Sequence, residues 1–490
     1  MIGLKPRQQR RNGNEIPQRV HLVGAGGIHM SGIGQILLQR GHTVTGSDLT
    51  LSEHTARLEA LGGRVFQGHD ASHVRDAQLV VATAAAKSDN PEVTEAQRLG
   101  IPLISRAEMV QKLLADREVI AVAGTHGKTT TSSMAALMTV RGELDPLVLI
   151  GGDMRDLGNA NARDGAGRIA VVEADEYAEA FLQYEPRIAV ITNVEPDHLD
   201  YYGTVERLGQ AFLAFSRRVR ADGILIACAD NTWAASIAET REAEGAHVER
   251  YGIDAADVDW RATRIRGNDR GGLDCVVLLS GQELGRLSLG VPGRHNLLDA
   301  LGALAASMRA GVDFHRASQA ASEFQGAKRR FELLGEVDIE GGTVTVIDDY
   351  AHHPTEVRAT LSAARARFAG RRLVGCFQPH TYTRSQYLLD DFRTCFEGLE
   401  TLYLLRTYEA RENPDRGMDA RTLAAEIERP APVYLDSFEE ATERIAGDLR
   451  PGDVFFTIGA GDVTELGPMV LAALEARAAE ADDSSDRGAS

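Results

Sequence analysis

Residues 124–131 read Gly124-Thr125-His126-Gly127-Lys128-Thr129-Thr130-Thr131, directly after the apolar run Val119–Ala123 and before a helical pattern. Glycine-rich backbone between a strand and a helix can surround phosphate oxygens with N–H groups, and the helix N-terminus adds positive potential. Lys128 can neutralise β- and γ-phosphates, and the Thr129 hydroxyl can ligate Mg²⁺. The stretch therefore predicts a strand, phosphate loop and helix, with G-x-x-G-K-T spacing shorter than the usual motif.

Polar groups follow two further apolar runs, as expected for parallel strands that are buried on both faces. Glu173-Ala174-Asp175-Glu176 follows residues 169–172, and Asn193-Val194-Glu195-Pro196-Asp197-His198 follows residues 188–191. The carboxyl ends of parallel strands meet at the ligand crevice, so Glu173 and His198 are candidate metal ligands. These features predict a central, mostly parallel domain over residues 116–324, with an antiparallel part at 255–290 and a helix at 297–310.

A second glycine-rich turn lies near the N-terminus, where Gly24-Ala25-Gly26-Gly27-Ile28-His29-Met30-Ser31-Gly32 follows the strand predicted at 20–23. Asp48 ends the next predicted strand, where an acid that binds a ribose is expected. The pattern favours nucleotide or dinucleotide binding over a plain strand-to-helix turn. Strands alternating with helices predict a doubly wound domain over residues 18–115.

Residues 325–472 contain a third series of predicted strands, at 344–347, 373–377, 402–404 and 454–457, with helical stretches between them. The chain is therefore predicted to be an α/β protein of three domains. Residues 1–17 and 473–490 are polar or small, and we expect both to be disordered tails.

Charge and composition exclude several functional classes. The 490 residues include 71 acidic and 53 basic side chains, a net charge of −18, which argues against nonspecific nucleic-acid and membrane-surface binding. No run of about 18 apolar residues occurs, so we expect no membrane insertion. The four cysteines show no metal-binding spacing, which favours reduced thiols and a cytoplasmic location.

Ordered motifs make the chain resemble the Mur ligase family of ATP-dependent, amide-forming enzymes from about residue 18 to residue 470. The motifs are G-A-G-G-I-x-M-S-G, G-S-D, A-G-T-H-G-K-T-T-T, E-A-D-E, T-N-V-E-P-D-H-L-D, G-R-H-N, R-R-F-E, D-D-Y-A-H-H-P-T-E and F-Q-P-H-T-Y-T-R. The resemblance implies a Rossmann-like N-terminal domain for a UDP-sugar, a central P-loop ATPase domain, and a Rossmann-like C-terminal domain for an amino acid.

The resemblance also implies a reaction in peptidoglycan precursor synthesis. The lactyl carboxylate of UDP-N-acetylmuramate would attack the γ-phosphate of ATP, and the amine of L-alanine would then displace phosphate from the acyl phosphate. UDP-N-acetylmuramate, L-alanine and ATP would be the substrates, with one or two Mg²⁺ ions as cofactor. The sequence does not specify an oligomeric state.

Site residues follow from the resemblance by motif. The expected ATP-binding residues are Gly124, Thr125, His126, Gly127, Lys128, Thr129, Thr130, His295, Asn296, Arg330 and Asp349. The expected UDP-sugar residues are Gly24, Gly26, Gly27, Met30, Ser31, Asp48 and Arg106. Those for the amino acid are Tyr350, His352 and Arg384, and those for the metal are Thr129, Glu173 and His198. The expected catalytic residues are Lys128, His198, Arg330, His352 and Arg384.

The sequence departs from the family pattern in four respects. His29 replaces a glycine of the first turn, Thr83-Ala84-Ala85 stands where serines are common, and Asp299 replaces a frequent asparagine. Several relatives bridge their metals with a carbamylated lysine, but this chain has no lysine between Lys128 and Lys328. We therefore expect a second magnesium ion to depend on His198, phosphate and water.

Three alternatives remain open at this stage. A ligase that recycles murein tripeptide would share the sugar nucleotide and the family motifs. A nicotinamide-dependent oxidoreductase would use the first glycine-rich turn and Asp48, although it has no need of the loop at 124–131. A catalytically inactive nucleotide sensor is disfavoured because Lys128, Thr129 and Arg384 are all present.

Overall fold

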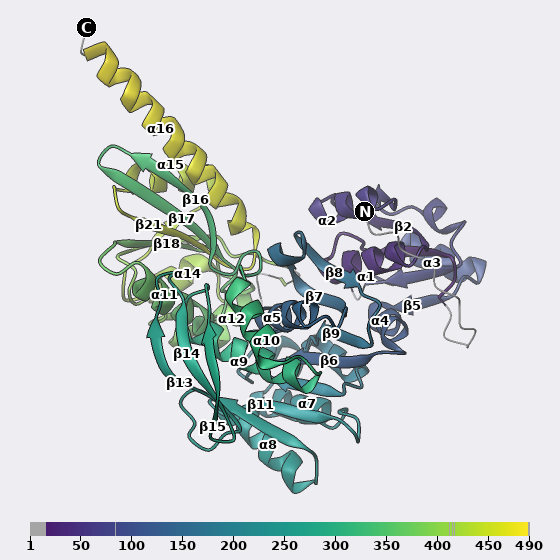
Figure 1. The fold of residues 1–490 in the computed structure, drawn as a ribbon. Helices are drawn as coiled ribbons and strands as arrows, with labels where there is room; N and C mark the ends of the chain where they lie inside the picture. The colour runs from purple at the N-terminus through teal and green to yellow at the C-terminus, as the bar shows by residue number, and fades with distance from the viewer. Residues whose placement is uncertain (1–15, 84, 411, 414, 416, 489–490) are drawn as a thin grey trace.

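The computed structural model describes residues 16–83, 85–410, 412–413, 415 and 417–488, with side chains up to residue 479. Its strands form three sheets, of five, ten and six strands, which follow one another along the chain (Figure 1). The prediction of a three-domain α/β fold is confirmed. The expected tail at 1–17 lies outside the described residues except for Ile16 and Pro17, and Ile16 packs against the first hydrophobic core.

The first sheet is entirely parallel, in the order β3-β2-β1-β4-β5. Its strands are β1 (Arg19–Val23), β2 (Thr43–Asp48), β3 (Arg64–Gln67), β4 (Leu79–Ala82) and β5 (Leu103–Ser105). Its helices are α1 (Ile28–Gln39), α2 (Glu53–Ala60), α3 (Pro91–Leu99) and α4 (Arg106–Leu114). The order reverses beside β1, and the glycine-rich turn between β1 and α1 therefore lies at the switch point, where α/β sheets bind ligands.

The central sheet has the order β15-β14-β13-β12-β11-β10-β6-β9-β7-β8. Its strands are β6 (Glu118–Ala123), β7 (Leu147–Met154), β8 (Ala160–Asp164), β9 (Ile169–Glu173), β10 (Ile188–Ile191), β11 (Ile224–Cys228), β12 (Val248–Gly252), β13 (Trp260–Gly267), β14 (Leu273–Leu279) and β15 (Gln282–Ser288). Its helices are α5 (Lys128–Arg141), α6 (Leu199–Tyr202), α7 (Val205–Ser216), α8 (Thr232–Ala243), α9 (Arg294–Arg309) and α10 (Phe314–Glu323). The antiparallel part predicted at 255–290 is present, and it extends the edge of this same sheet.

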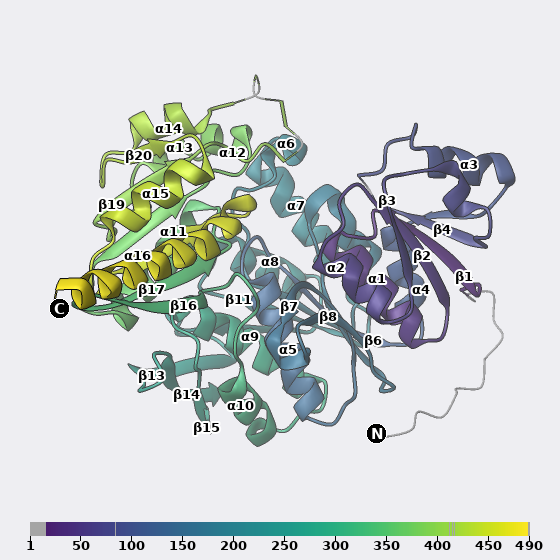
Figure 2. The same cartoon turned by 90° about the horizontal axis from the view of Figure 1, so that it is seen from above.

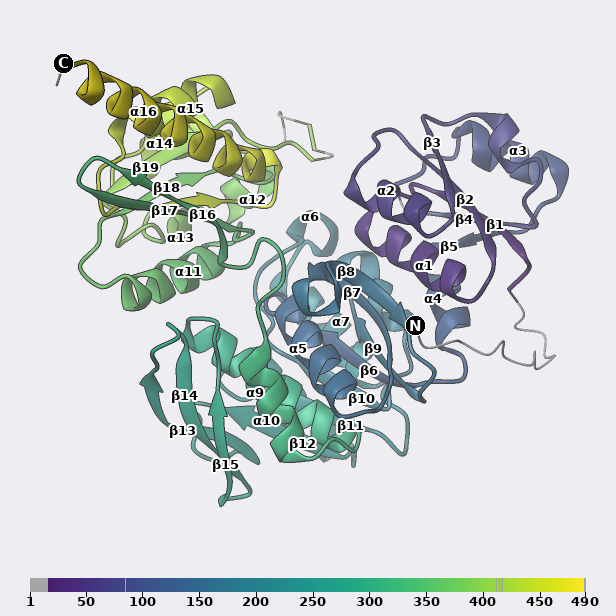
Figure 3. The same cartoon turned by 45° about the horizontal axis from the view of Figure 1, so that its top comes forward.

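The third sheet has the order β16-β17-β21-β18-β19-β20, with only β16 antiparallel to its neighbour. Its strands are β16 (Glu332–Ile339), β17 (Gly342–Asp349), β18 (Leu373–Phe377), β19 (Thr401–Leu405), β20 (Val433–Leu435) and β21 (Val454–Ile458). Its helices are α11 (Pro354–Arg367), α12 (Tyr382–Tyr387), α13 (Leu389–Phe392), α14 (Ala420–Glu426), α15 (Phe438–Asp448) and α16 (Leu466–Gly488). Helix α11 packs on one face and helices α15 and α16 on the other (Figure 3).

The C-terminal segment corrects one expectation. Residues 473–488 continue α16, whereas the sequence analysis expected a disordered tail from residue 473. Val470 and Leu474 are fully buried against the third sheet, so packing anchors the first turns of this helix. The following residues are rich in alanine, glutamate and arginine, which have high helix propensity and continue the helix.

Polar pairs join the first domain to the rest of the chain. Arg57 of α2 donates two hydrogen bonds to the Asp153 carboxylate of β7, at 2.8 and 3.3 Å. Lys328, which lies between the second and third sheets, pairs with Glu53 at 2.9 Å. Helix α2 therefore contacts both the central sheet and the chain that leads into the third domain. Figure 2 shows this helix on the side of the first domain that faces the central domain. Within the described part of the chain, no helix combines the length and apolar character that crossing a membrane requires.

Candidate active site

The phosphate loop lies between β6 and α5, as the sequence predicts. Gly127 has a φ of 77°, and a Cβ there would lie 2.3 Å from the Asp299 carboxylate, so only glycine fits. The segment that follows β10 holds the loop in place. The Asn193 side chain accepts from the backbone N–H of His126 at 2.8 Å and donates to its carbonyl at 3.0 Å. The loop backbone is therefore fixed by hydrogen bonds before any phosphate binds.

Lys128 begins α5, and its ammonium points back into the loop. Its Nζ donates to the carbonyls of Gly124 (2.6 Å) and Thr125 (3.1 Å) and to Oε1 of Glu176 (2.9 Å). The Glu176 Oε2 atom is buried and lies 2.8 Å from the same ammonium, but it makes no hydrogen bond of its own. Burial lowers the pKa of Lys128 but the nearby carboxylates raise it more, so the side chain is a cation directly beside the phosphate loop.

A cavity of about 1000 Å³, counted with its open mouth, lies between the central and third domains. Seven of the eleven residues expected to bind ATP line it: His126, Gly127, Thr130, His295, Asn296, Arg330 and Asp349. The other four, Gly124, Thr125, Lys128 and Thr129, belong to the adjoining loop and the start of α5. The structure thus brings three distant stretches of sequence together around one pocket.

Burial shifts the pKa values of two groups in this cavity. It raises the pKa of Asp349 to about 6, although the carboxylate accepts backbone N–H groups from Ala351 and Phe331, both at 2.8 Å. Burial, together with Arg330, lowers the pKa of His295 to about 4. His295 is therefore neutral near pH 7, and Asp349 offers an anionic acceptor that suits a ribose hydroxyl.

Thr129 and Glu173 each approach the backbone of β7. A Cβ placed on Gly151 would meet the Glu173 carboxylate at 2.5 Å, and one on Gly152 would meet the Thr129 methyl group at 2.8 Å. A hydroxyl and a carboxylate are oxygen donors of the kind that Mg²⁺ prefers, so these two residues fit the metal. His198 is a nitrogen donor, and its Nε2 lies 3.7 Å from Glu176 Oε1, which places it beside Lys128.

The residues expected to hold the amino acid form a connected group in the third domain. The rings of Tyr350 and His352 meet edge to face at 5.3 Å, and the His352 ring lies 5.7 Å from the ring of His380. Arg384 Nη1 contacts His380 Nδ1 at 3.0 Å. Its Nε and Nη2 both donate to Oδ1 of Asp197, at 3.2 and 2.8 Å. Arg384 therefore also ties the third domain to the central one.

The first glycine-rich turn links β1 to α1, as the sequence predicts. Oδ2 of Asp48 accepts from the Gly26 N–H at 2.8 Å, and Arg106 Nη1 lies 3.0 Å from Nδ1 of His29. The side chains of Met30 and Ser31 are buried, and the Ser31 hydroxyl donates to the Ile28 carbonyl at 3.0 Å. Met30 belongs to the first hydrophobic core, and helix periodicity places Ser31 on the face of α1 where Gly32 and Gln35 meet β7 and β8.

Several site residues were missed as individual candidates, although the quoted motifs contain them. Each pairs with a residue that was singled out. Glu176 contacts Lys128, Asp197 contacts Arg384, and Glu356 contacts both Arg330 and His352. All three are acids, and the only signal for them in the sequence was their place inside the quoted motifs.

Comparison with known proteins agrees with this architecture. Models of the Mur ligase catalytic, middle and glutamate ligase domains match residues 19–118, 122–307 and 329–461. A UDP-N-acetylmuramate–L-alanine ligase from Geobacter sp. (strain M21) is 42% identical over 462 residues, which cover 94% of this chain and 98% of that protein. The chain belongs to the Mur ligase family. The same-named protein from Saccharopolyspora erythraea is 43% identical over 465 residues, 94% of either chain.

Solved structures of other Mur ligases have the same fold. The UDP-N-acetylmuramate–alanine ligase of Thermotoga maritima matches with a TM-score of 0.79 and 29% identity, over 94% of this chain and 99% of its own. A murein peptide ligase from Psychrobacter arcticus matches over the same shares with a TM-score of 0.71 and 26% identity. Membership of the Mur ligase family removes the nicotinamide-dependent oxidoreductase from the alternatives.

Asp299, which departs from the Mur ligase pattern, gives a stability prediction. Burial raises its pKa to about 7, above its value in the unfolded chain. The neutral form is therefore favoured on folding, and this contribution to stability is complete below about pH 4 and is lost as the pH rises through about 7. We expect Asp299→Asn to raise the Tm of the nucleotide-free protein by a few degrees at about pH 8 and by little at about pH 5.

Calorimetric scans at both pH values check this expectation, with exposed Asp257→Asn as the matched control. An equal shift at the two pH values, or a lower Tm at pH 8, would contradict the assignment of a buried and destabilising carboxylate.

Proposed function

We propose that this protein joins L-alanine to the lactyl carboxylate of UDP-N-acetylmuramate, with ATP as the co-substrate, in peptidoglycan precursor synthesis. Membership of the Mur ligase family and the near-full-length relatives named for this activity support the proposal. The observation that carries it is the pocket between the second and third domains, where expected ATP residues from three stretches of sequence meet. Glu356, which lines this cavity, accepts the backbone N–H of His352 at 3.0 Å.

The proposed chemistry activates the substrate carboxylate as an acyl phosphate, which the alanine amine then attacks with loss of phosphate. Phosphoryl transfer depends on positioning and charge neutralisation more than on acid–base catalysis. Lys128 and Arg330 would neutralise the phosphates, Asp349 and Asn296 would hold the ribose and adenine, and Arg384 would pair with the alanine carboxylate. Thr129, Glu173 and His198 would hold a magnesium ion, which supplies further positive charge when bound.

The first domain would bind the UDP-sugar at the turn after β1. The backbone of Gly24–Gly27 would approach the diphosphate, and Asp48 would contact the uridine part. His29 carries an imidazole where the family has a glycine, and its contact with Arg106 indicates that the pair would face the substrate together. ATP is a cytoplasmic co-substrate, so we also propose a cytoplasmic location.

The mass of the product tests this proposal. Purified protein is incubated with ATP, Mg²⁺ and UDP-N-acetylmuramate, with L-alanine, L-serine, glycine or the L-Ala-γ-D-Glu-diaminopimelate tripeptide added separately. We expect a gain of one alanyl residue, stoichiometric with ADP release. A gain only with the tripeptide would instead assign the protein to murein recycling, and no product with any donor would favour a nucleotide sensor.

A further inference from the structure

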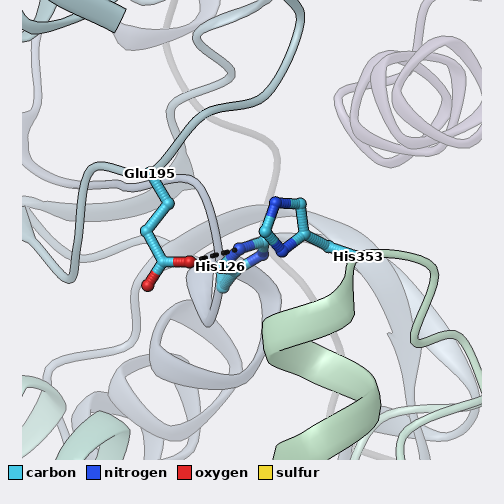
Figure 4. Close-up of side chains that lie close together, drawn as sticks. All are labelled: His126, Glu195 and His353. Atoms are coloured by element: carbon cyan, nitrogen blue, oxygen red, sulfur yellow. Dashed lines mark ion pairs between the residues drawn. The ribbon is translucent and has the colours of Figure 1, made fainter. Parts of the chain in front are cut away.

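His126 of the phosphate loop lies between two carboxylates from different domains. Its Nε2 is 3.5 Å from Oε2 of Glu195, which follows β10 in the central domain. Its Nδ1 is 3.3 Å from Oε1 of Glu356, in the first turn of α11 in the third domain. The ring of His353, at the N-terminus of α11, lies 4.4 Å from the His126 ring (Figure 4). The phosphate loop thus contacts the third domain mainly through one imidazole.

These side chains could also be considered as a metal site, since His126, Glu195 and His353 have ligand atoms within 4.8 Å of one another. The hydrogen bonds of His353 argue against this. Its Nε2 lies 3.1 Å from the Pro196 carbonyl, and its Nδ1 accepts from the Thr355 N–H at 3.2 Å. Both ring nitrogens are therefore used within the protein, and the cation between the carboxylates is the His126 imidazolium itself.

The charge of His126 follows from its surroundings. Its side chain is 11% exposed, and burial alone would lower its pKa, but Glu195 and Glu356 raise the pKa to about 9. Asp299 of α9 adds a third nearby acid. His353 is neutral, because burial lowers its pKa to about 4. His126 is therefore an imidazolium near pH 7, and it loses its charge as the pH rises through about 9.

Glu356 connects this contact to the rest of the site. One of its oxygens, Oε2, accepts the backbone N–H groups of His352 (3.0 Å) and His353 (3.3 Å), which caps α11. The other, Oε1, lies 3.4 Å from Nη1 of Arg330. Glu195 in turn accepts from the Thr355 hydroxyl at 2.7 Å. One buried carboxylate thus contacts the phosphate loop, a cation of the nucleotide pocket and the backbone that carries His352.

We propose that His126 is a positioning residue whose imidazolium, through Glu356 and Glu195, holds helix α11 of the third domain against the phosphate loop. This contact sets the amino-acid group at a fixed distance from the nucleotide pocket. The catalytic consequence rests on the proposed function, whereas the docking of the two domains does not. Loss of the charge should therefore separate the third domain from the loop and weaken alanine use more than ATP use.

The first experiment measures domain docking without substrates. Small-angle X-ray scattering of the full chain at about pH 7 and about pH 10 should show a larger radius of gyration at the higher pH for the wild type. His126→Asn should give the larger value at both pH values, and exposed His247→Asn should behave as the wild type. An unchanged radius in His126→Asn would overturn the proposal.

The second experiment measures kinetics. We expect His126→Asn and Glu356→Gln each to raise the KM for alanine about tenfold, with a smaller change in the KM for ATP. Glu356→Gln keeps an oxygen for the α11 cap but removes the charge. The double variant should lose little more than the worse single variant, because both substitutions break the same contact. Additive losses, or a change confined to the KM for ATP, would contradict the proposal.

The two experiments separate this inference from the proposed function. If the wild type makes no product from alanine, the function fails and the scattering result alone decides the docking role. The KM for alanine is also measured at about pH 7 and about pH 10. If product forms and this KM rises with pH to the same extent in the wild type and in His126→Asn, the function stands and the positioning role of His126 is wrong.

Discussion

Lys128→Ala should reduce ADP formation by about a thousandfold or more while leaving UDP-sugar binding nearly unchanged. The ammonium donates to two carbonyls of the phosphate loop, and Glu176 holds it there. The glycine turn expected to bind the UDP-sugar belongs to a separate sheet. Turnover assays with calorimetric titration of UDP-N-acetylmuramate check both parts of this expectation.

Removing Lys128 also leaves Glu176 buried without its partner, which would destabilise the protein by itself. The double variant Lys128→Ala/Glu176→Gln has no unpaired buried carboxylate. We therefore expect it to be more stable than Lys128→Ala but equally inactive. Lys112→Ala, on α4 of the first domain, is the control for loss of a lysine. Loss of sugar binding together with turnover, at an unchanged Tm, would show that the two sites are wrongly assigned to separate domains.

The sequence predicted the parallel strands and the phosphate loop because each is a local signal. The runs at 119–123, 169–172, 188–191 and 224–227 are apolar on both faces, and the structure has β6, β9, β10 and β11 there. Strands β7 and β8 were not predicted. Strand β7 pairs with β9 within the central sheet. Strand β8 runs beside α1 of the first domain, where Asn161 bonds to Gln35 and to the Ile28 carbonyl, so part of its environment comes from another domain.

Ionic partners were harder to predict than the site residues themselves. Lys128 is recognisable from its position after Gly127, but its contact with Glu176 spans 48 residues. Asp197 and Arg384 lie 187 residues apart, and no periodic pattern relates them. Local spacing in the motif G-A-G-G-I-H-M-S-G likewise does not reveal that the side chains of Met30 and Ser31 are buried. Pairing between domains is a property of the packed fold, and local spacing carries no signal for it.

Arg384→Ala should have two effects, because the guanidinium contacts Asp197 as well as the group expected to bind alanine. Both residues are buried, with side chains 7% exposed, and Arg384 lowers the pKa of Asp197 well below its usual range. Removing one partner of a buried pair costs about 3–5 kcal/mol, so we expect a lower Tm. We also expect the KM for alanine to rise by about a hundredfold, since a carboxylate would lose its charged partner.

A second substitution separates these two effects. In Arg384→Ala/Asp197→Asn the carboxylate no longer needs a partner, so the Tm should recover, whereas the KM for alanine should stay high. Arg358→Ala, which breaks a pair with exposed Asp391, is the matched control and should change neither quantity much. Steady-state kinetics and calorimetry on the wild type and these three variants measure the KM for alanine and the Tm. If the KM for alanine recovers together with the Tm, Arg384 acts only by docking the third domain on the central one, and the alanine carboxylate binds elsewhere.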